Sequence, residues 1–298
     1  MSDPHLKLVS QRPALSQARA PLTCQVEVVN EWGDASHIHI PAERDLTVYV
    51  DKRELITLMT LGGQPEWLVL GYLRNQRLVN EVADIESITV DWEVGAAAVR
   101  TRSGIDGIEA RTASRVVTTG CGQGSVFGGL MDSVDAIRLP ESATVRQSQL
   151  QAIVNTIRLQ DSVYKEAGSV HGCGLFKGEE QLIFVEDVGR HNAVDAIAGW
   201  MWLQEPAAQR GDDKVFYTTG RLTSEMVIKA AQMGIAVVVS RSGITQMGLE
   251  VAQRVGLCAI GRATHRRFLC FSHPERIVYD AVPHRPEPLH GHANSAAA

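Results

Sequence analysis

Lys214 to Ser240 reads KVFYTTGRLTSEMVIKAAQMGIAVVVS, and this stretch decides the fold class. Its first five residues, Lys214 to Thr218, are rich in β-branched and aromatic side chains and predict a strand. Thr223 to Met233 has the pattern of a helix, which Gly234 is suited to end. The run from Ile235 to Ser240 predicts a strand buried on both faces. A strand, a helix and a second buried strand in succession indicate an α/β fold.

The same alternation continues on both sides of this stretch. The further predicted elements are a helix from Ser142 to about Glu166, a strand from Leu182 to Val185, helices from Asn192 to Leu203 and from Thr245 to Val255, and strands from Leu257 to Ile260 and from Phe268 to Phe271. We therefore expect a three-layer α/β domain over residues 131–282. Its ligand should lie at the carboxyl ends of the strands.

The first half of the chain has a different pattern, in which strands dominate. We expect strands from Thr23 to Val29, Leu46 to Thr60, Ile85 to Trp92, Ala96 to Thr101 and Arg115 to Thr119, with one helix from Pro65 to Arg77. These elements predict a smaller β-rich domain over residues 23–130. Residues 1–22 and 283–298 lack such patterns and are expected to be flexible tails.

Composition narrows the class of protein. The 298 residues carry a net charge of -5, with 44% hydrophobic and 21% charged residues, as in ordinary soluble globular proteins. A net negative charge argues against bulk nucleic-acid binding. No apolar run is long enough for a signal peptide or a membrane span, so we expect a cytoplasmic protein. The five cysteines form no C-x-x-C pair, and we expect them to be reduced thiols.

One cysteine lies in an unusual loop. Thr118 to Gly129 reads TTGCGQGSVFGG and holds five glycines around Cys121. Such a loop suits a reactive thiol on a flexible arm. The alternative, a glycine-rich turn with an incidental cysteine, is equally compatible with this stretch alone.

Four predicted strands are followed by loops that combine glycine, arginine and hydroxyl residues. These loops are Glu186 to Asn192, Thr219 to Glu225, Arg241 to Thr245, and Gly261 to Arg267. Helix N-termini, close backbone approach and guanidinium groups together favour a phosphate or pyrophosphate ligand. Each loop taken singly is also compatible with a solvated turn. The spacing matches neither a P-loop nor a G-x-G-x-x-G motif.

Two histidines are candidates for chemistry. His171 lies in a predicted small-residue loop, Gly168 to Gly174, two residues from Cys173. It has no partners at metal-ligand spacing, so we expect no metal site. His191 follows Asp187 by four residues, and the two could touch if the helix begins early. An ordinary hydrogen-bonded loop histidine is the alternative for both.

Several segments resemble one known family. Glu186 to Asp195 reads EDVGRHNAVD, Thr219 to Lys229 reads TGRLTSEMVIK, and Gly261 to Phe268 reads GRATHRRF. With Leu68 to Arg74, LVLGYLR, these segments closely resemble the formate dehydrogenase accessory sulfurtransferase family, FdhD. The resemblance covers roughly residues 23 to 280.

This resemblance implies a sulfur carrier. A persulfide would form on Cys121 with sulfur from a cysteine desulfurase, and would pass to the molybdenum cofactor before its insertion into formate dehydrogenase. The cofactor implied is bis(molybdopterin guanine dinucleotide), bound as cargo. The resemblance also implies a cytidine-deaminase-like α/β domain and a homodimer. The candidate cofactor-binding residues are Arg190, His191, Gly220, Arg221, Arg241, Arg262, Ala263, Thr264, His265, Arg266 and Arg267.

The chain departs from the family pattern in its cysteine loop. Gly124 replaces the second cysteine of the C-x-x-C that family members carry, so transfer would use direct attack by an acceptor or another thiol such as Cys173. Two rival hypotheses follow. One is a non-enzymatic chaperone that binds the cofactor without moving sulfur. The other is a cysteine hydrolase that pairs Cys121 with His171 or His191. The P-C-x-x-C of zinc deaminases is absent, so deaminase chemistry is not expected.

Overall fold

A six-stranded sheet forms the second half of the molecule. The computed structural model describes residues 12–105, 107 and 134–282. The strand order is β10-β9-β11-β12-β13-β14, with parallel pairs at β11/β12 and β12/β13 and an antiparallel hairpin at each edge. The strands are β9 (His171–Lys177), β10 (Glu180–Asp187), β11 (Lys214–Thr218), β12 (Val237–Ser240), β13 (Cys258–Thr264) and β14 (Arg267–Ser272). The predicted α/β class is confirmed.

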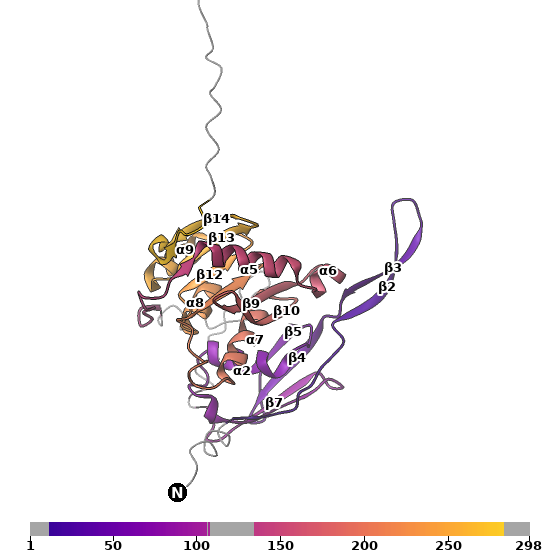
Figure 1. Cartoon of the computed structure of the whole chain (residues 1–298). Helices are drawn as coiled ribbons and strands as arrows, with labels where there is room; N and C mark the ends of the chain where they lie inside the picture. Colours follow the sequence, from indigo (N-terminus) through magenta and orange to yellow (C-terminus); the bar gives the residue numbers. More distant parts are fainter. Residues whose placement is uncertain (1–11, 106, 108–133, 283–298) are drawn as a thin grey trace, which may run out of the picture.

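Helices cover both faces of this sheet (Figure 1). They are α5 (Gln147–Leu159), α7 (Arg190–Trp202), α8 (Ser224–Gln232) and α9 (Gln246–Val255). Alternate residues of β11 face opposite ways: Tyr217 packs in the core beneath α5, whereas Phe216 belongs to the core shared with α7 and α8. The expected likeness to the cytidine-deaminase fold stays a prediction.

A second, five-stranded sheet has the order β1-β6-β7-β4-β5. Its strands are β1 (Ala14–Leu15), β4 (Arg44–Val50), β5 (Arg53–Thr60), β6 (Ile85–Asp91) and β7 (Ala96–Thr101). The single strand expected from Leu46 to Thr60 was wrong, because the chain reverses at Asp51 and Lys52, with φ of 48° and 71°. A two-residue hairpin turn needs such positive φ values, and glycine, its usual signal, is missing here.

Two parts of the first half differ from expectation. Residues 12–22 were predicted as tail, yet Ala14–Leu15 pairs in parallel with β6, and Ser16 and the backbone N–H of Ala18 donate to Glu66. The strand β3 (Ala35–Pro41), which was not predicted, pairs with β2 (Thr23–Val29). Figure 1 shows that these two strands form a hairpin extending away from the sheets.

The predicted helix from Ser142 to Glu166 is interrupted. α5 ends at Leu159, and a separate short helix, α6 (Val163–Ala167), begins after Ser162, whose side chain accepts from the N–H of Lys165. Glu186 accepts from the N–H groups of Val163 and Tyr164 at 2.6 and 3.1 Å. These contacts come from β10, so the helical periodicity of the local sequence carries no sign of the break. Before α5, the short strand β8 (Val145–Arg146) pairs with β15 (Ile277–Val278).

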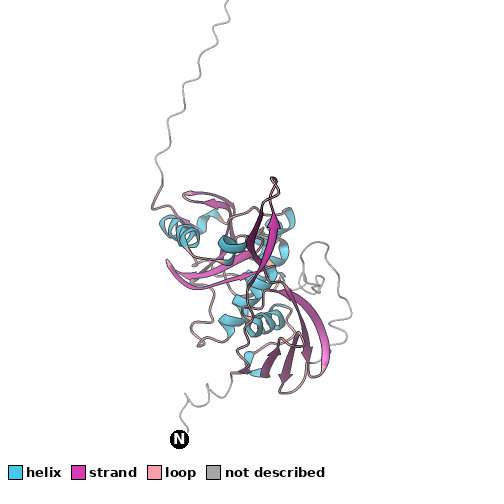
Figure 2. Cartoon of the chain, turned by 90° about the vertical axis from the view of Figure 1, so that its right-hand side faces the viewer, coloured by secondary structure: helices cyan, strands magenta, loops and turns pink. Residues whose placement is uncertain are grey.

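The two sheets are joined by a pair of helices. α2 (Pro65–Asn75), close to the predicted Pro65–Arg77, packs against α7, and one hydrophobic core cluster continues from the five-stranded sheet through both helices. In Figure 2 the five-stranded sheet lies at the lower end of the molecule, with helices between it and the rest. Two short 3-10 helices, Val82–Asp84 and Pro274–Arg276, complete the described elements.

Within the described residues, no helix is both long and apolar enough to cross a membrane. The predicted strand Arg115–Thr119, the Cys121 loop and the tail over 283–298 lie outside the described residues.

The contact between α2 and α7 depends on two glycines. A Cβ on Gly199 would lie 2.0 Å from the carbonyl oxygen of Trp67, and one on Gly71 would lie 1.7 Å from that of Asp195. Both obstacles are backbone atoms, which cannot rotate away.

We predict that Gly199→Ala lowers the free energy of unfolding by about 1–3 kcal/mol or more, because the helices must separate to admit the methyl group. Urea unfolding followed by circular dichroism measures this as a lower midpoint. The control is Gly243→Ala, where the added Cβ meets nothing within 4 Å. Equal midpoints for the two variants would contradict the close crossing.

Candidate functional site

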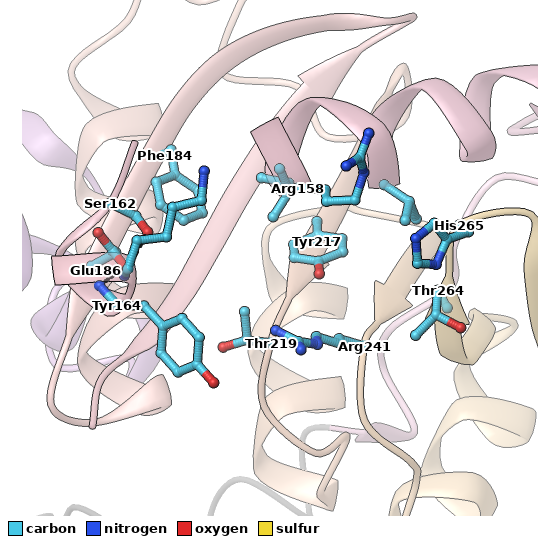
Figure 3. A pocket seen from close by; sticks show the side chains of 14 residues that line it. Arg158, Ser162, Tyr164, Phe184, Glu186, Tyr217, Thr219, Arg241, Thr264 and His265 are labelled. Carbon is cyan, nitrogen blue, oxygen red and sulfur yellow. Dashed lines mark hydrogen bonds between the residues drawn. The ribbon is translucent and has the colours of Figure 1, made fainter. Parts of the chain in front are cut away.

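A cavity of about 220 Å³ opens where β11, β12 and β13 end. Tyr217, Thr219 and Arg241 come from the ends of β11 and β12 and lie at its centre (Figure 3). α6 lies on one side with Tyr164, and the β13–β14 hairpin lies on the other side with His265 (Figure 3). Among the described residues, the cavity is lined by Val154, Ile157, Arg158, Ser162, Tyr164, Lys165, Phe184, Glu186, Tyr217, Thr219, Arg241, Ala263, Thr264 and His265. The cavity therefore lies at the edge of the sheet where the sequence analysis predicted a ligand site.

The charge of the cavity is predominantly positive. Of the part of the chain that the structure describes, Arg158, Lys165 and Arg241 line it, and Glu186 contributes one carboxylate. Burial raises the pKa of Glu186, although the two N–H bonds from α6 oppose that shift. Because those bonds occupy its oxygens, Glu186 is a structural acceptor that holds α6 in place. The arrangement suits an anionic ligand.

Aromatic rings supply the remaining surface. The Arg241 guanidinium lies over the Tyr164 ring, 5.9 Å from its centroid. Burial raises the pKa of Tyr217 to about 12, so its hydroxyl stays protonated at neutral pH and can donate a hydrogen bond. Rings beside cations suit a ligand that combines negative charge with a flat, unsaturated group.

A polar cluster adjoins the cavity through Thr219. The Oγ1 of Thr219 lies 3.4 Å from His171 Nδ1 and accepts from the N–H of Gly172 at 3.0 Å. Burial lowers the pKa of His171, and the charges of Arg190 and Arg221 lower it further. His171 is therefore neutral at pH 7.

Gly220 has a specific packing role in this cluster. A Cβ at this position would lie 2.7 Å from Cδ of Arg190, so only glycine lets the arginine side chain cross the end of β11. The Arg190 side chain itself is buried, at the first residue of α7. Arg190 and Gly220 thus lie against one another beside the cavity, with Arg221 next in the chain, and their role in cofactor binding stays a prediction.

The segment from Gly261 to Arg267, predicted as a loop between two strands, is mostly part of the strands of a hairpin. β13 continues to Thr264 and pairs with β14, with positive φ at Arg262 and His265. Ala263, Thr264 and His265 line the cavity. Arg262, Arg266 and Arg267 are exposed on the same hairpin and are absent from the lining.

His191, a predicted site residue, lies on α7 facing α8. It is 2% exposed, and its Nε2 lies 3.3 Å from a carboxylate oxygen of Glu225. Glu225 also lies 3.3 Å from Lys229, which in turn contacts Asp195 at 2.8 Å. His191 therefore belongs to a buried charge network between α7 and α8, and not to the cavity wall.

The predicted small-residue loop from Gly168 to Gly174 is corrected in part, because His171 to Gly174 belong to β9, an interior strand of the sheet. Cys173 is buried there and donates to Thr218 Oγ1 at 3.3 Å. Burial raises the pKa of Cys173 to about 12, so the thiol stays protonated and poorly nucleophilic. A buried, protonated Cys173 is poorly suited to act as a resolving thiol. The hydrolase pairing of Cys121 with His171 or His191 stays a hypothesis, because Cys121 lies outside the described residues.

Several cavity residues were missed by the sequence analysis. Arg158, Tyr164 and Lys165 come from the region read as one continuous helix, and Tyr217 reads as an ordinary core residue of a strand. No local motif distinguishes them. Tyr164 and Lys165 reach the cavity because the chain breaks between α5 and α6, and Tyr217 reaches it from the end of β11. Cys121 lies outside the described residues.

The match to a family model covers most of the molecule just described. The model of the FdhD/NarQ family matches residues 41–278, which include the six-stranded sheet, the cavity lining and every strand of the five-stranded sheet except β1. The chain belongs to the FdhD/NarQ family. The resemblance read from its motifs is thereby confirmed.

Curated relatives agree with this placement. The chain is 28% identical over 236 residues to the sulfur carrier protein FdhD of Bacillus pumilus, covering 79% of this chain and 89% of the relative. It is 28% identical over 255 residues to the sulfur carrier protein FdhD of Bacillus subtilis, covering 83% and 94%.

A solved structure supports the fold. The crystal structure of a protein assigned as a formate dehydrogenase accessory protein, from Desulfotalea psychrophila, superposes with a TM-score of 0.69 at 24% identity. The match covers 87% of this chain and all of that one (100%). The mixed arrangement of sheets and helices is therefore shared with a known structure.

The Asp187 carboxylate connects β5 to α7, and its titration makes the stability of the protein depend on pH. It accepts from Thr60 and Asn192, and burial raises its pKa to about 6 against a usual 3.8. A raised carboxyl pKa means that the stabilising contribution is complete below about pH 4 and is lost as pH rises through 6.

We predict that the stability of the wild type relative to Asp187→Asn, which cannot titrate, decreases on the order of 2 kcal/mol between pH 4 and pH 7. Urea unfolding of both proteins at the two pH values measures the difference. A difference that is constant with pH, or that grows as pH rises, would contradict the assignment.

Proposed function

We propose that this protein is a sulfur carrier required for formate dehydrogenase activity. The observation that supports this most is the cationic cavity at the carboxyl ends of β11, β12 and β13, in a chain whose relatives are named sulfur carrier proteins. The proposed partners are a cysteine desulfurase and apo-formate dehydrogenase. The proposed setting is the cytoplasm, with the protein as a homodimer.

Cys121 is the proposed carrier of sulfur. Its thiolate attacks the outer sulfur of the desulfurase persulfide, a new S–S bond forms on Cys121, and the desulfurase cysteine leaves as a thiolate. This step exchanges one S–S bond for another and needs no outside electrons. Release of the outer sulfur as sulfide breaks this S–S bond, returns Cys121 to a thiolate and needs two electrons. They come from two thiols, which become a disulfide, or from the molybdenum centre that receives the sulfur.

The cavity is the proposed site for one part of the cargo. Arg158, Lys165 and Arg241 would pair with pyrophosphate oxygens, and Tyr164 and Tyr217 would contact a flat ring. At about 220 Å³ it is smaller than the usual ligand pocket of 300–1,000 Å³. It therefore suits one guanine nucleotide arm of bis(molybdopterin guanine dinucleotide) rather than the whole molecule.

The exposed hairpin arginines complete this proposal. Arg262, Arg266 and Arg267 lie on the hairpin that carries His265 into the cavity, and are placed for phosphates that extend beyond it. Arg190 and Arg221, beside Thr219, would contact cargo on the other side. These groups would bind and orient the cargo, so that proximity supplies most of the acceleration.

A second candidate function is a chaperone that binds the cofactor without moving sulfur. Gly124, which stands where the family has a second cysteine, favours it.

We predict that incubation with a cysteine desulfurase and cysteine adds one sulfur atom to the wild type and none to Cys121→Ala. Intact-protein mass spectrometry under non-reducing conditions measures the gain. Cys24→Ala, which removes an exposed thiol from β2, is the control and should gain sulfur normally. A wild type that gains no sulfur would favour the chaperone.

We predict that guanosine diphosphate, used as a probe for the cargo arm, binds about tenfold more weakly to Arg241→Ala than to the wild type, because a charge-assisted hydrogen bond is lost. Isothermal titration calorimetry measures the dissociation constants. Arg12→Ala, which removes an exposed arginine paired with Glu205, is the control and should bind as the wild type does. Equal affinities for all three proteins would remove Arg241 from the site.

A further inference from the structure

Two cysteines meet on the hairpin that forms one wall of the cavity. The Sγ atoms of Cys258 on β13 and Cys270 on β14 lie 3.8 Å apart, in van der Waals contact. The two residues are not directly opposite in the ladder, since Cys270 pairs with Ile260, and Ala259 pairs with Ser272. A β-bulge between these two pairs shifts the strands where the thiols meet.

The environment of the two thiols is asymmetric. Cys258 is buried among apolar side chains beneath α5, whereas Cys270 is only partly buried. Cys270 Sγ also lies 3.2 Å from the carbonyl oxygen of Ser272. A small reagent can therefore reach the thiol of Cys270, whereas the thiol of Cys258 is buried behind it.

The contact between the thiols also differentiates their acidity. The hydrogen bond shared with Cys258 lowers the pKa of Cys270, against the opposing effect of burial. The same hydrogen bond, together with burial, raises the pKa of Cys258. Thiolate character and access thus coincide at Cys270, as in sensor cysteines that have a resolving partner.

We propose that Cys258 and Cys270 form a dithiol–disulfide site that hydroperoxides oxidise, with Cys270 as the attacking thiol and Cys258 as the resolving one. The cysteine pair does not depend on the proposed sulfur-carrier function or on Cys121.

The chemistry balances with hydrogen peroxide as the sole oxidant, and an organic hydroperoxide releases an alcohol in place of the first water. The Cys270 thiolate attacks one peroxide oxygen, an S–O bond forms, the O–O bond breaks, and hydroxide leaves to become water. Cys258 then loses its proton and attacks the Cys270 sulfur, forming the S–S bond and breaking the S–O bond. The second hydroxide leaves as water. Two thiols are oxidised by two electrons in total, and one peroxide becomes two waters.

The modification would act on the cavity wall. A disulfide bond is about 2.05 Å long, so the two sulfurs must approach from 3.8 Å and tie β13 to β14 beside the bulge. The hairpin tied in this way carries Thr264 and His265 to the cavity. A redox change at the cysteines is therefore coupled through two paired strands to the ligand side of the sheet.

The test uses full-length Cys121→Ser protein, so that the proposed carrier thiol takes no part. Equimolar hydrogen peroxide is followed by alkylation under denaturing conditions, proteolysis and mass spectrometry. We expect a peptide pair joined through Cys258 and Cys270, which dithiothreitol converts back to two alkylated peptides. If Cys258 and Cys270 both stay fully alkylatable after the peroxide treatment, the proposal is wrong.

A second measurement assigns the two roles. With Cys258→Ser added, oxidised Cys270 cannot be resolved, and dimedone should trap its sulfenic acid. Cys270→Ser in the same background should give at least about tenfold less adduct at Cys258. Equal trapping at both positions would overturn the assignment of the attacking thiol. Cys173→Ser is the matched control, because this buried thiol contacts Thr218 instead, and the cross-link should form unchanged.

Discussion

The close crossing of α2 and α7 is the constraint on which the rest of the structure depends. α7 is buried on nearly all of its surface, so it needs packing partners on every side. The six-stranded sheet supplies one side, and α2, backed by the five-stranded sheet, supplies the other. Gly71 and Gly199 let the two helix backbones touch, and no side chain larger than glycine fits at either position. The two halves therefore share a single core.

Polar groups buried at this junction account for the most recognisable motifs of the chain. Asp187 bonds to Thr60 at the end of β5, and Asn192 donates to the carbonyl oxygen of Met59. The carboxylate of Asp195 accepts hydrogen bonds from Asn75 of α2 at 2.7 Å and from Lys229 of α8 at 2.8 Å. Charged groups without water must be paired, since an unpaired buried charge costs several kcal/mol. Residues 186–195 thus hold the helices together. Arg190 also adjoins the polar cluster around Thr219, beside the cavity.

The cavity follows from the same framework. α7 packs against β9 and β10, and their edge of the sheet carries Glu186, which anchors α6 through two backbone N–H groups. α6 in turn places Tyr164 beside Arg241. The opposite wall is the β13–β14 hairpin, whose bulges orient His265 toward the cavity and place Cys258 against Cys270. One wall is thus positioned by a carboxylate and the other by strand pairing.

The sequence by itself determined the α/β class, the central strands and helices, and the edge at which a ligand should lie. These properties follow from local periodicity, as at Lys214–Thr218 and Gln246–Val255, where expectation and structure agree closely. Tertiary structure decided the turn at Asp51, the break after Leu159, and the strand around Cys173. It also decided that His191 faces Glu225 while Tyr217 and Arg158 face the cavity. Each of these depends on a partner distant in sequence, so local spacing holds no signal for it.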